Sequence, residues 1–310
     1  MKLAIGFFDG VHLGHRRILA EADAALTFRE HPLSVLAPDK APPLLMTPEE
    51  RFAAISTALK GFKGLKGFNG LNGLNGFNGL KGLNDRVRAL DFTRELAAEP
   101  AEAFAMRLRR DYPDLETILC GPNWRFGAGG AGDADFLRTR GFAVEVVPLE
   151  ELGGAPVSST RVRAALQAGD LPLANAMLGR SFAVAGEVVP GKGEGHKLGF
   201  PTINVRPTNP CLARLLPFGV YVADTVWGRA VANWGQAPTM GEQAWTSPIL
   251  EVHVVGREEG EQVGRGEGGK VEISLLWFLR PERRFASIEE LRKQIASDVF
   301  SASHSPQDRL

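Results

Sequence analysis

Apolar and polar positions follow two different patterns along the chain. In the first half, short apolar runs alternate with segments of helical periodicity, which predicts strands and helices in turn. The strands are expected at 2–7, 24–28, 86–92, 115–121 and 142–148, and the helices at 15–22, 47–59, 100–112 and 160–168. The helix at 47–59 opens on Thr47 as its N-cap, with Pro48 at the first helical position. This order favours a parallel sheet with helices on its faces, an α/β fold that binds ligands beyond the carboxyl ends of its strands.

From residue 182 onward, short β-rich runs dominate and turns separate them. The runs that predict strands cover 182–189, 219–227, 229–235, 249–255 and 270–279. A closed or nearly closed antiparallel barrel is the natural packing for such runs. The segment 287–300 predicts a terminal helix, with Ser287 as its N-cap and Glu290 completing a capping box.

One segment, residues 61–84, departs from the composition of a globular protein. It carries eight glycines in 24 residues, one at every third position, each followed by Phe or Leu and then Lys or Asn. A collagen helix needs proline in its repeat, and this run has none. A stable α-helix is also disfavoured, because each glycine costs about 1 kcal/mol relative to alanine. We expect an inserted loop or a loosely packed extended segment; a binding arm is the less favoured alternative.

Composition narrows the classes of function. The 310 residues are enough for two domains, and 36 basic residues balance 36 acidic ones, so no net charge draws the chain to nucleic acid or to an anionic membrane. The two cysteines, Cys120 and Cys211, lie far apart, which argues against a disulfide framework or a structural zinc site. No apolar run is long enough to span a bilayer, and no signal peptide is evident. We therefore expect a cytoplasmic protein with small-molecule partners.

The stretch GFFDGVHLGH, residues 6–15, stands where the first strand gives way to the first helix. His12 and His15 could form a metal clip, serve a phosphate site, or be ordinary turn residues. Zinc on a helix usually needs histidines at i and i+4 with further ligands, and nothing nearby supplies these. A helix N-terminus presents free N–H groups and positive charge to an anion. The position directly after a strand therefore favours a phosphate site.

This stretch resembles the signature of the HxGH nucleotidylyltransferases, and in the form FDGVHLGH that of the bacterial bifunctional riboflavin kinase/FMN adenylyltransferases. The resemblance continues through five further blocks in order. They are TFREHPLSVL (27–36), LMTPEERF (45–52), FTRELA (92–97), GPNWRFGAGGAGD (121–133) and VSSTRVRAALQAGDL (157–171). In that family this half, with its Rossmann-like parallel sheet, transfers AMP from ATP to FMN.

The resemblance implies a set of adenylyltransferase site residues. His12 and His15 are the expected catalytic residues, and the binding residues are Asp9, Asn123, Arg125, Ser159, Thr160 and Arg163. The block SSTRVR also has the physical character of a second anion site, with hydroxyls at Ser159 and Thr160 and with Arg163 at a helix start. Ser159 and Thr160 could instead simply cap the helix at 160–168, which is the commoner role for such residues.

The second half carries GKGEGHKLGFPTIN, residues 191–204. It is not a Walker loop, because no Gly-Lys-Ser/Thr follows at the required spacing, but it resembles the riboflavin kinase motif GxGxGxxLGFPTxN. The resemblance implies a kinase barrel of six strands, with Mg²⁺ as the cofactor at Thr202 and Asn204 and with Glu251 as the catalytic base. A solvent-facing strand position is the alternative for Glu251. The loop over the ATP phosphates would be formed by Gly191, Gly193, Gly195 and Lys197.

Together, the two resemblances imply an enzyme of FAD synthesis. We expect an adenylyltransferase domain at 1–165, a linker at 166–180, a riboflavin kinase domain at 181–300 and a tail at 301–310. Its small-molecule partners would be riboflavin, FMN, FAD and ATP; an oligomer is possible. One alternative is a nucleotidylyltransferase for another phosphate, such as phosphopantetheine or nicotinamide mononucleotide, which would leave the GFPTIN segment unexplained. The other is a flavin-binding regulatory protein that has lost an activity.

Overall fold

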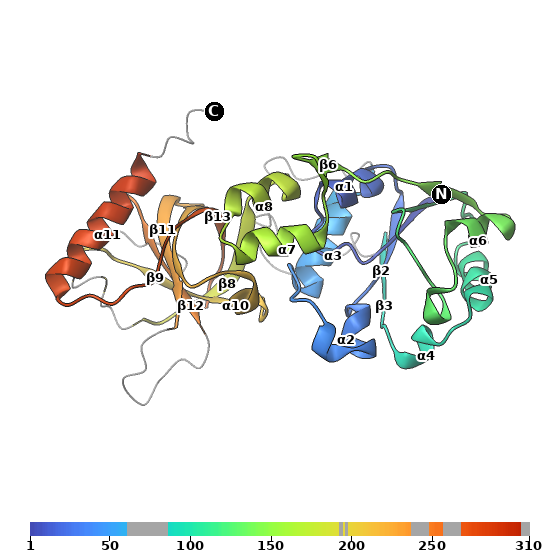
Figure 1. The fold of residues 1–310 in the computed structure, drawn as a ribbon, viewed down its shortest axis with the longest axis horizontal. Coiled ribbons are helices and arrows are strands. Elements are labelled where there is room, and N and C mark those ends of the chain that lie inside the picture. Colours follow the sequence, from blue (N-terminus) through green and yellow to red (C-terminus); the bar gives the residue numbers. More distant parts are fainter. Residues whose placement is uncertain (61–85, 192–194, 196–197, 237–247, 257–267, 305–310) are drawn as a thin grey trace. The chain divides into compact units, whose positions relative to one another are not determined.

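The computed structural model describes residues 1–60, 86–191, 195, 198–236, 248–256 and 268–304 (Figure 1). The glycine-rich segment 61–84, and with it the prediction made for it, lies outside these residues, as do Gly193 and Lys197. The chain divides into two compact units, Met1–Ser159 and Thr160–Leu310. The expected domain limits stay a prediction. The division falls before residue 165, and the segment expected as a linker contains a helix, α8 (Leu171–Leu178).

The first unit is built on a parallel sheet, as predicted. Its five strands stand in the order β3-β2-β1-β4-β5, and every neighbouring pair runs parallel. Their bounds are β1 (Lys2–Ile5), β2 (Ala24–Phe28), β3 (Val87–Leu90), β4 (Thr117–Cys120) and β5 (Ala143–Val146). The strand order reverses at β1, whose neighbours are β2 and β4. The carboxyl end of β1 is thus the switch point where ligands of such sheets bind.

Helices connect these strands. They are α1 (Leu13–Ala20), α2 (Pro32–Leu36), α3 (Pro48–Ala58), α4 (Arg94–Ala97), α5 (Ala101–Asp111) and α6 (Ala134–Thr139), with short 3-10 turns η1 (Pro38–Lys40) and η4 (Ala128–Gly130) and a small hairpin, β6 (Glu151–Leu152) with β7 (Ala155–Pro156). The prediction for α3 is confirmed, since Thr47 and Glu50 form a complete capping box. Helix α1 begins at Leu13 and not at His15, because His12 is its N-cap. Neither α2 nor α6 was expected, since both are too short to show a helical period.

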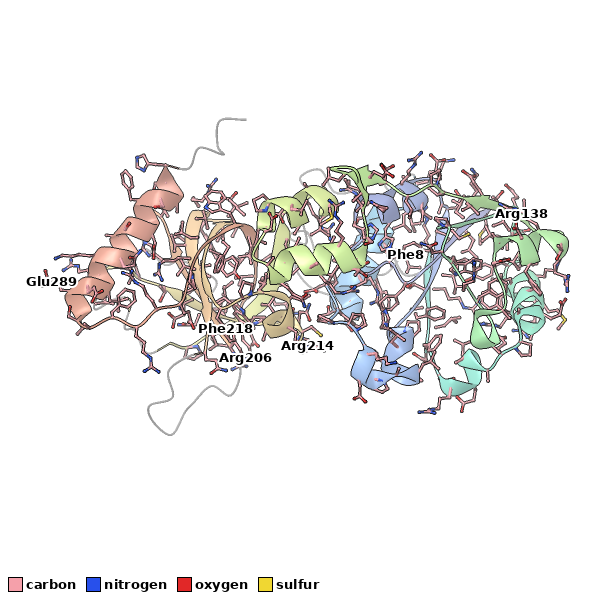
Figure 2. The ribbon with its side chains drawn as sticks, in the orientation of Figure 1. Phe8, Arg138, Arg206, Arg214, Phe218 and Glu289 are labelled. Carbon is pink, nitrogen blue, oxygen red and sulfur yellow. The ribbon has the colours of Figure 1, made fainter. Side chains whose placement is uncertain are left out.

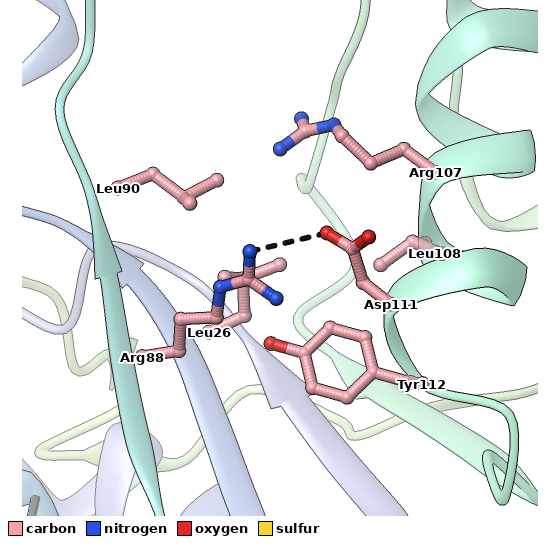
Figure 3. A pocket seen from close by; sticks show the side chains of 7 residues that line it. All are labelled: Leu26, Arg88, Leu90, Arg107, Leu108, Asp111 and Tyr112. Carbon is pink, nitrogen blue, oxygen red and sulfur yellow. Dashed lines mark ion pairs between the residues drawn. The ribbon is translucent and has the colours of Figure 1, made fainter.

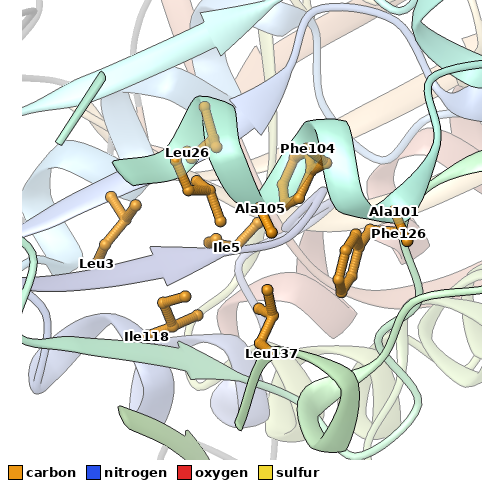
Figure 4. Close-up of a cluster of buried hydrophobic side chains, with 10 residues drawn as sticks. Leu3, Ile5, Leu26, Ala101, Phe104, Ala105, Ile118, Phe126 and Leu137 are labelled. Carbon is orange, nitrogen blue, oxygen red and sulfur yellow. The ribbon is translucent and has the colours of Figure 1, made fainter. Parts of the chain in front are cut away.

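Alternate residues of the central strands build the core of this unit. Leu3 and Ile5 lie on one face of β1, and they pack with Leu26 and Ile118 from the neighbouring strands. Helices α5 and α6 cover this face with Phe104, Ala105, Leu108 and Leu137 (Figure 4). All of these side chains are buried.

The second unit begins with helices α7 (Ser159–Gln167) and α8 and continues into a closed barrel of six strands, β10-β11-β12-β9-β8-β13. The strands are β8 (Phe182–Val189), β9 (Ile203–Pro207), β10 (Gly219–Thr225), β11 (Gly228–Gly235), β12 (Ile249–Val254) and β13 (Lys270–Pro281), and each pairs antiparallel with its neighbours. The predicted barrel is confirmed. The apolar pattern alone missed β9, because this strand is short and ends on Pro207.

Two helices complete the second unit, α10 (Leu212–Leu215) and the terminal α11 (Ile288–Ser303). Ser287 caps α11 as predicted, since its hydroxyl accepts a hydrogen bond from the Glu290 backbone N–H at 3.2 Å. The capping box differs from the expected one, because the Glu290 carboxylate accepts from the backbone N–H of Ala286 at 3.1 Å. Within the described residues, no helix is both long enough and apolar enough to cross a membrane.

Candidate active sites

A strained turn follows β1 and forms the centre of the first candidate site. Phe8, Gly10 and Val11 have positive φ angles of 57°, 80° and 41° (Figure 2 labels Phe8). Positive φ is easy for glycine but uncommon for the other two residues, and each such residue costs about 1–3 kcal/mol. A conformation of this kind persists only where the surrounding structure holds it in place.

Two contacts from distant parts of the sequence hold this turn. The buried Asp9 carboxylate accepts the backbone N–H of Leu45, at 3.1 Å and 3.2 Å from its two oxygens. The Ser159 hydroxyl donates to the backbone carbonyl of Asp9 at 2.8 Å. Asp9 thus has a clear role in the geometry of the turn, and Ser159, the second residue of SSTRVR, contacts the turn directly.

The turn delivers His12 and His15 to the start of α1. The His12 Nδ1 atom accepts a long hydrogen bond of 3.4 Å from the His15 backbone N–H, so a neutral His12 ring carries its proton on Nε2. The two rings stack with their centroids 3.6 Å apart. Gly14 lies against this stack, and a Cβ there would be 3.4 Å from the His12 ring, which is ordinary contact distance. The motif therefore places two imidazoles side by side at a helix N-terminus.

His15 is an electrically neutral member of this pair. Burial, and then the neighbouring His12, lower the pKa of His15 well below its ordinary value of 6.5. Its Nδ1 atom is buried and makes no hydrogen bond within the described part of the chain. A buried polar atom without a partner costs about 1–3 kcal/mol, so this atom is suited to meet a ligand oxygen.

Arg51 is a buried arginine that contacts residues at the ends of β1 and β2, next to this turn. It is not among the site residues predicted from the sequence. Its side chain is fully buried on α3, and Nη2 donates to the carbonyls of Phe28 and Arg29 at the end of β2, each at 2.7 Å. The guanidinium lies 4.0 Å from the centre of the Phe7 ring, just after β1. Burial lowers the pKa of Arg51 to about 10, and the negative charge of Asp9 opposes this shift. The sequence offered one signal for Arg51, its place in the block LMTPEERF that resembles the family, but the helical pattern gave no reason to assign it a role.

The remaining predicted residues are more dispersed. Asn123 and Arg125 are exposed on the loop after β4, the neighbour of β1, and Arg125 lies 3.9 Å from Asp133. Thr160 and Arg163 follow Ser159 on α7, where Thr160 is exposed and Arg163 is buried. Among the residues predicted for this site, a hydrogen bond joins Asp9 with Ser159, and a hydrogen bond and a ring stack join His12 with His15.

The second candidate site is a row of polar residues across three barrel strands. Asn204 on β9 stands opposite Glu251 on β12, and Glu251 stands opposite Asn233 on β11. Residues paired in this way project from the same face of a sheet, with Cβ atoms about 5 Å apart. Asn233 also donates a hydrogen bond to Glu282, a residue that the sequence did not single out. The barrel thus gathers two amides and two carboxylates.

The electrostatics of this row favour a proton acceptor. The side chain of Glu251 is exposed, yet the protein packed around its carboxylate, and second the Glu282 carboxylate, raise its pKa above the ordinary 4.5. A raised pKa brings a carboxylate closer to the basicity that general-base catalysis needs at neutral pH. A solvent-facing strand position, the alternative considered for Glu251, describes its exposure but does not explain its polar neighbours Asn204 and Asn233 or the nearby Glu282 carboxylate.

Two glycines of GKGEGHK lie directly against the predicted metal ligands. A Cβ at Gly191 would overlap the Asn204 amide, and a Cβ at Gly195 would lie 3.0 Å from the Thr202 hydroxyl oxygen. Hydroxyl and amide oxygens suit Mg²⁺. No group of three His, Cys, Asp or Glu side chains in the described ranges could hold a metal. The donor set therefore fits an ion that takes most of its other ligands from nucleotide phosphates and water.

A small pocket elsewhere in the first unit has no link to either site. It lies between β2, β3 and α5, and the ion pair between Arg88 and Asp111, 3.1 Å long, crosses it (Figure 3). Its lining residues are Leu26, Arg88, Leu90, Arg107, Leu108, Asp111 and Tyr112. None of the predicted site residues is among them.

The fold and the two sites define a two-unit protein that combines a nucleotidylyltransferase-type α/β sheet with a barrel of the kinase type. The family model described as FAD synthetase matches residues 1–60 and 80–161, and the model described as riboflavin kinase matches residues 178–305. The chain belongs to the bifunctional riboflavin kinase/FMN adenylyltransferase family. The predicted family and fold class are confirmed.

Relatives cover nearly the whole chain. The bifunctional riboflavin kinase/FMN adenylyltransferase of Pseudomonas fluorescens is 34% identical and covers 96% of this chain and 90% of its own. The proteins of the same description from Escherichia coli K12 and Bacillus subtilis are 32% and 30% identical, each with 97% of this chain covered and with 91% and 90% of their own. A solved structure titled macrolide-efflux protein, from Streptococcus pneumoniae, is similar with a TM-score of 0.75 and 23% identity, covering 98% of this chain and 93% of that one. At this identity the likeness concerns the fold alone.

Proposed function

We propose that the chain makes FAD in two steps. The barrel phosphorylates riboflavin with ATP to give FMN, and the α/β unit transfers AMP from ATP to FMN to give FAD and pyrophosphate. The observation that carries this proposal is the presence in one chain of both family modules. The hydrogen bond from Ser159 to Asp9 and the pairing of Asn204 with Glu251 support it. A nucleotidylyltransferase for another phosphate leaves the riboflavin kinase module unexplained. A flavin-binding regulatory protein would keep both modules and would differ by the loss of an activity.

In the adenylyltransferase, the phosphate of FMN attacks the α-phosphorus of ATP and pyrophosphate leaves. The protein has to hold two anions in line and neutralise the charge that develops on the phosphate oxygens. We assign the Nε2–H of His12 to a phosphate oxygen, because Nδ1 is occupied by the His15 backbone N–H. The unpartnered Nδ1 of His15 supports a second contact of the same kind. Ser159, Thr160 and Arg163 would serve the second anion.

In the kinase, a ribityl hydroxyl of riboflavin attacks the γ-phosphorus of ATP. We assign Glu251 as the base that accepts the hydroxyl proton, supported by its raised pKa and by its place between Asn204 and Asn233. Thr202 and Asn204 would hold Mg²⁺, which supplies positive charge to the phosphates when it is bound. Gly191 and Gly195 keep these side chains free of steric overlap.

The direct test is to incubate purified protein with riboflavin, ATP and Mg²⁺ and to separate the flavins by chromatography. We expect FMN first and FAD later. A parallel reaction with nicotinamide mononucleotide or phosphopantetheine in place of riboflavin tests the other nucleotidylyltransferase substrates. Adenylylation of either one without any flavin conversion would contradict the proposal, and flavin binding without conversion would indicate a regulatory protein.

A further inference from the structure

A buried histidine stands beside the kinase site and has no role in the reaction assigned above. His253 lies on β12 two residues after Glu251, so the two side chains project from the same face of the strand. Only 7% of His253 is exposed. Its Nδ1 atom lies 2.9 Å from the carbonyl oxygen of Pro201, and the Phe200 ring meets the imidazole edge-on with centroids 5.5 Å apart.

The contact to Pro201 comes where the backbone ladder stops. Strands β9 and β12 pair from Val205 with Leu250 to Ile203 with Val252, and the next position along would set Thr202 opposite His253. No strand pairing continues there, because β9 begins at Ile203. The side chain of His253 therefore connects β12 to the loop before β9, one position beyond the last paired residues.

This geometry also determines which ring nitrogen carries the proton. The Pro201 carbonyl oxygen can only accept a hydrogen bond, so Nδ1 of His253 has to be the donor. A neutral His253 is thus the Nδ1–H tautomer.

We propose that His253 is a positioning residue of the kinase site: by donating to the Pro201 carbonyl, it holds Thr202 and Asn204 at a set distance from Glu251. Glu251 and His253 stand on the same strand, β12. This strand therefore links the proposed base to the loop that carries Thr202. This inference rests on the proposed metal-binding role of Thr202 and Asn204. It predicts that loss of the donor weakens the binding of Mg²⁺ more than it slows the reaction at saturating Mg²⁺.

The first test compares amide variants that place a donor at different points. In His253→Asn the side-chain amide can occupy the place of Nδ1, whereas in His253→Gln it reaches the place of Nε2. We expect His253→Gln to raise the Mg²⁺ concentration for half-maximal FMN formation about three- to tenfold, the effect of one lost hydrogen bond. His253→Asn should stay within about twofold of the unchanged protein. FAD formation from supplied FMN at saturating Mg²⁺ serves as the internal control and should not change.

A second measurement does not depend on activity or on metal. Long-range ¹H–¹⁵N spectra of the Mg²⁺-free protein report the tautomer of each of the six histidines, and the signals that vanish in His253→Asn assign this ring. We expect the Nδ1–H form with a slowly exchanging proton. An Nε2–H tautomer would overturn the inference, even if His253→Gln failed to fold.

The variants Thr202→Ala and Asn204→Ala separate this inference from the assignment on which it rests. If these variants raise the Mg²⁺ requirement and His253→Gln does not, the positioning role is wrong and the metal ligands stand. If neither alanine variant changes the Mg²⁺ requirement, the metal assignment fails and the positioning role fails with it. An equal Mg²⁺ effect in His253→Asn and His253→Gln would also contradict the inference, since it would point to packing rather than to the donor.

Discussion

The two sites of this protein are built in opposite ways. The first uses consecutive residues: the turn from Phe8 to Val11 and the helix start at His12 and His15 lie within one short stretch, and strained backbone gives it its shape. The second takes Asn204, Glu251 and Asn233 from three strands and needs no unusual backbone angle among them. A contiguous motif is easy to find in a sequence, but its strained geometry depends on distant supports. A cross-strand row depends instead on register, which the barrel pairing supplies.

The strongest test of the separation between the sites is Glu251→Gln. Removal of the base should lower FMN formation by roughly 100- to 10,000-fold, the usual contribution of general-base catalysis. Supplied FMN should still be converted to FAD at an unchanged rate, as measured by chromatography. A comparable loss of both activities would show that the barrel row also serves adenylyl transfer.

The converse test is His12→Ala. Loss of one donor to the developing charge should slow the conversion of FMN to FAD by about 100- to 1,000-fold. The rate of FMN formation from riboflavin should remain within twofold of that of the unchanged protein. The Glu251→Gln protein, purified in the same way, is the matched control. FAD formation that survives in His12→Ala would remove His12 from the proposed mechanism.

The two sites should respond to acid with opposite signs. Folded His15 resists protonation, so stability is present above the ordinary pKa of 6.5 and is lost as the pH falls below it. One proton gives at most about 1.4 kcal/mol per pH unit. For Glu251 the folded pKa is raised, so its contribution is present below the ordinary 4.5 and is lost as the pH rises through the folded pKa. Because Glu251 is exposed, water screens its effect and we expect it to be the smaller one.

Urea titrations at pH 7.5 and 5.5, followed through amide NMR signals of each unit, measure this difference. The free energy of unfolding of the α/β unit should fall toward pH 5.5, and His15→Gln should reduce that fall. Replacement of the exposed His304 by Gln is the control and should leave it unchanged. Equal acid sensitivity in His15→Gln and the unchanged protein would assign the effect to other groups.

The smallest effect is expected from deletion of residues 61–84. The flanking residues already meet, because Arg86 Nη2 donates to the Lys60 carbonyl at 2.7 Å, and a short Gly-Ser link can therefore join them. Both activities should stay within twofold if the segment is a tolerated insert. Selective loss of FAD formation would show that the adenylyltransferase site uses this segment.

Local signals were enough for much of the fold. The periodicity of the first half predicted the parallel sheet, and the β-rich runs predicted the barrel, as the structure confirms. Caps at Thr47 and Ser287 were also evident, because a cap involves residues only three positions apart. The start of α1 was misplaced by two residues, because its N-cap is His12 and histidine is not among the residue types that usually signal a cap.

By itself, the sequence determined the alternation of strands and helices in the first half, the β-rich character of the second, the caps at Thr47 and Ser287, and the motifs that indicate both activities. Each of these depends on neighbours along the chain. Only the tertiary structure decided which distant groups these residues contact. Asp9 accepts a hydrogen bond from Leu45, Arg51 donates to the Phe28 carbonyl at the end of β2, and His253 contacts the Pro201 carbonyl. Hydrophobic periodicity records which face of an element is buried, but not which distant polar group it meets there. These long-range partners arise from strand order and register, and they decide whether a recognisable motif has a working geometry.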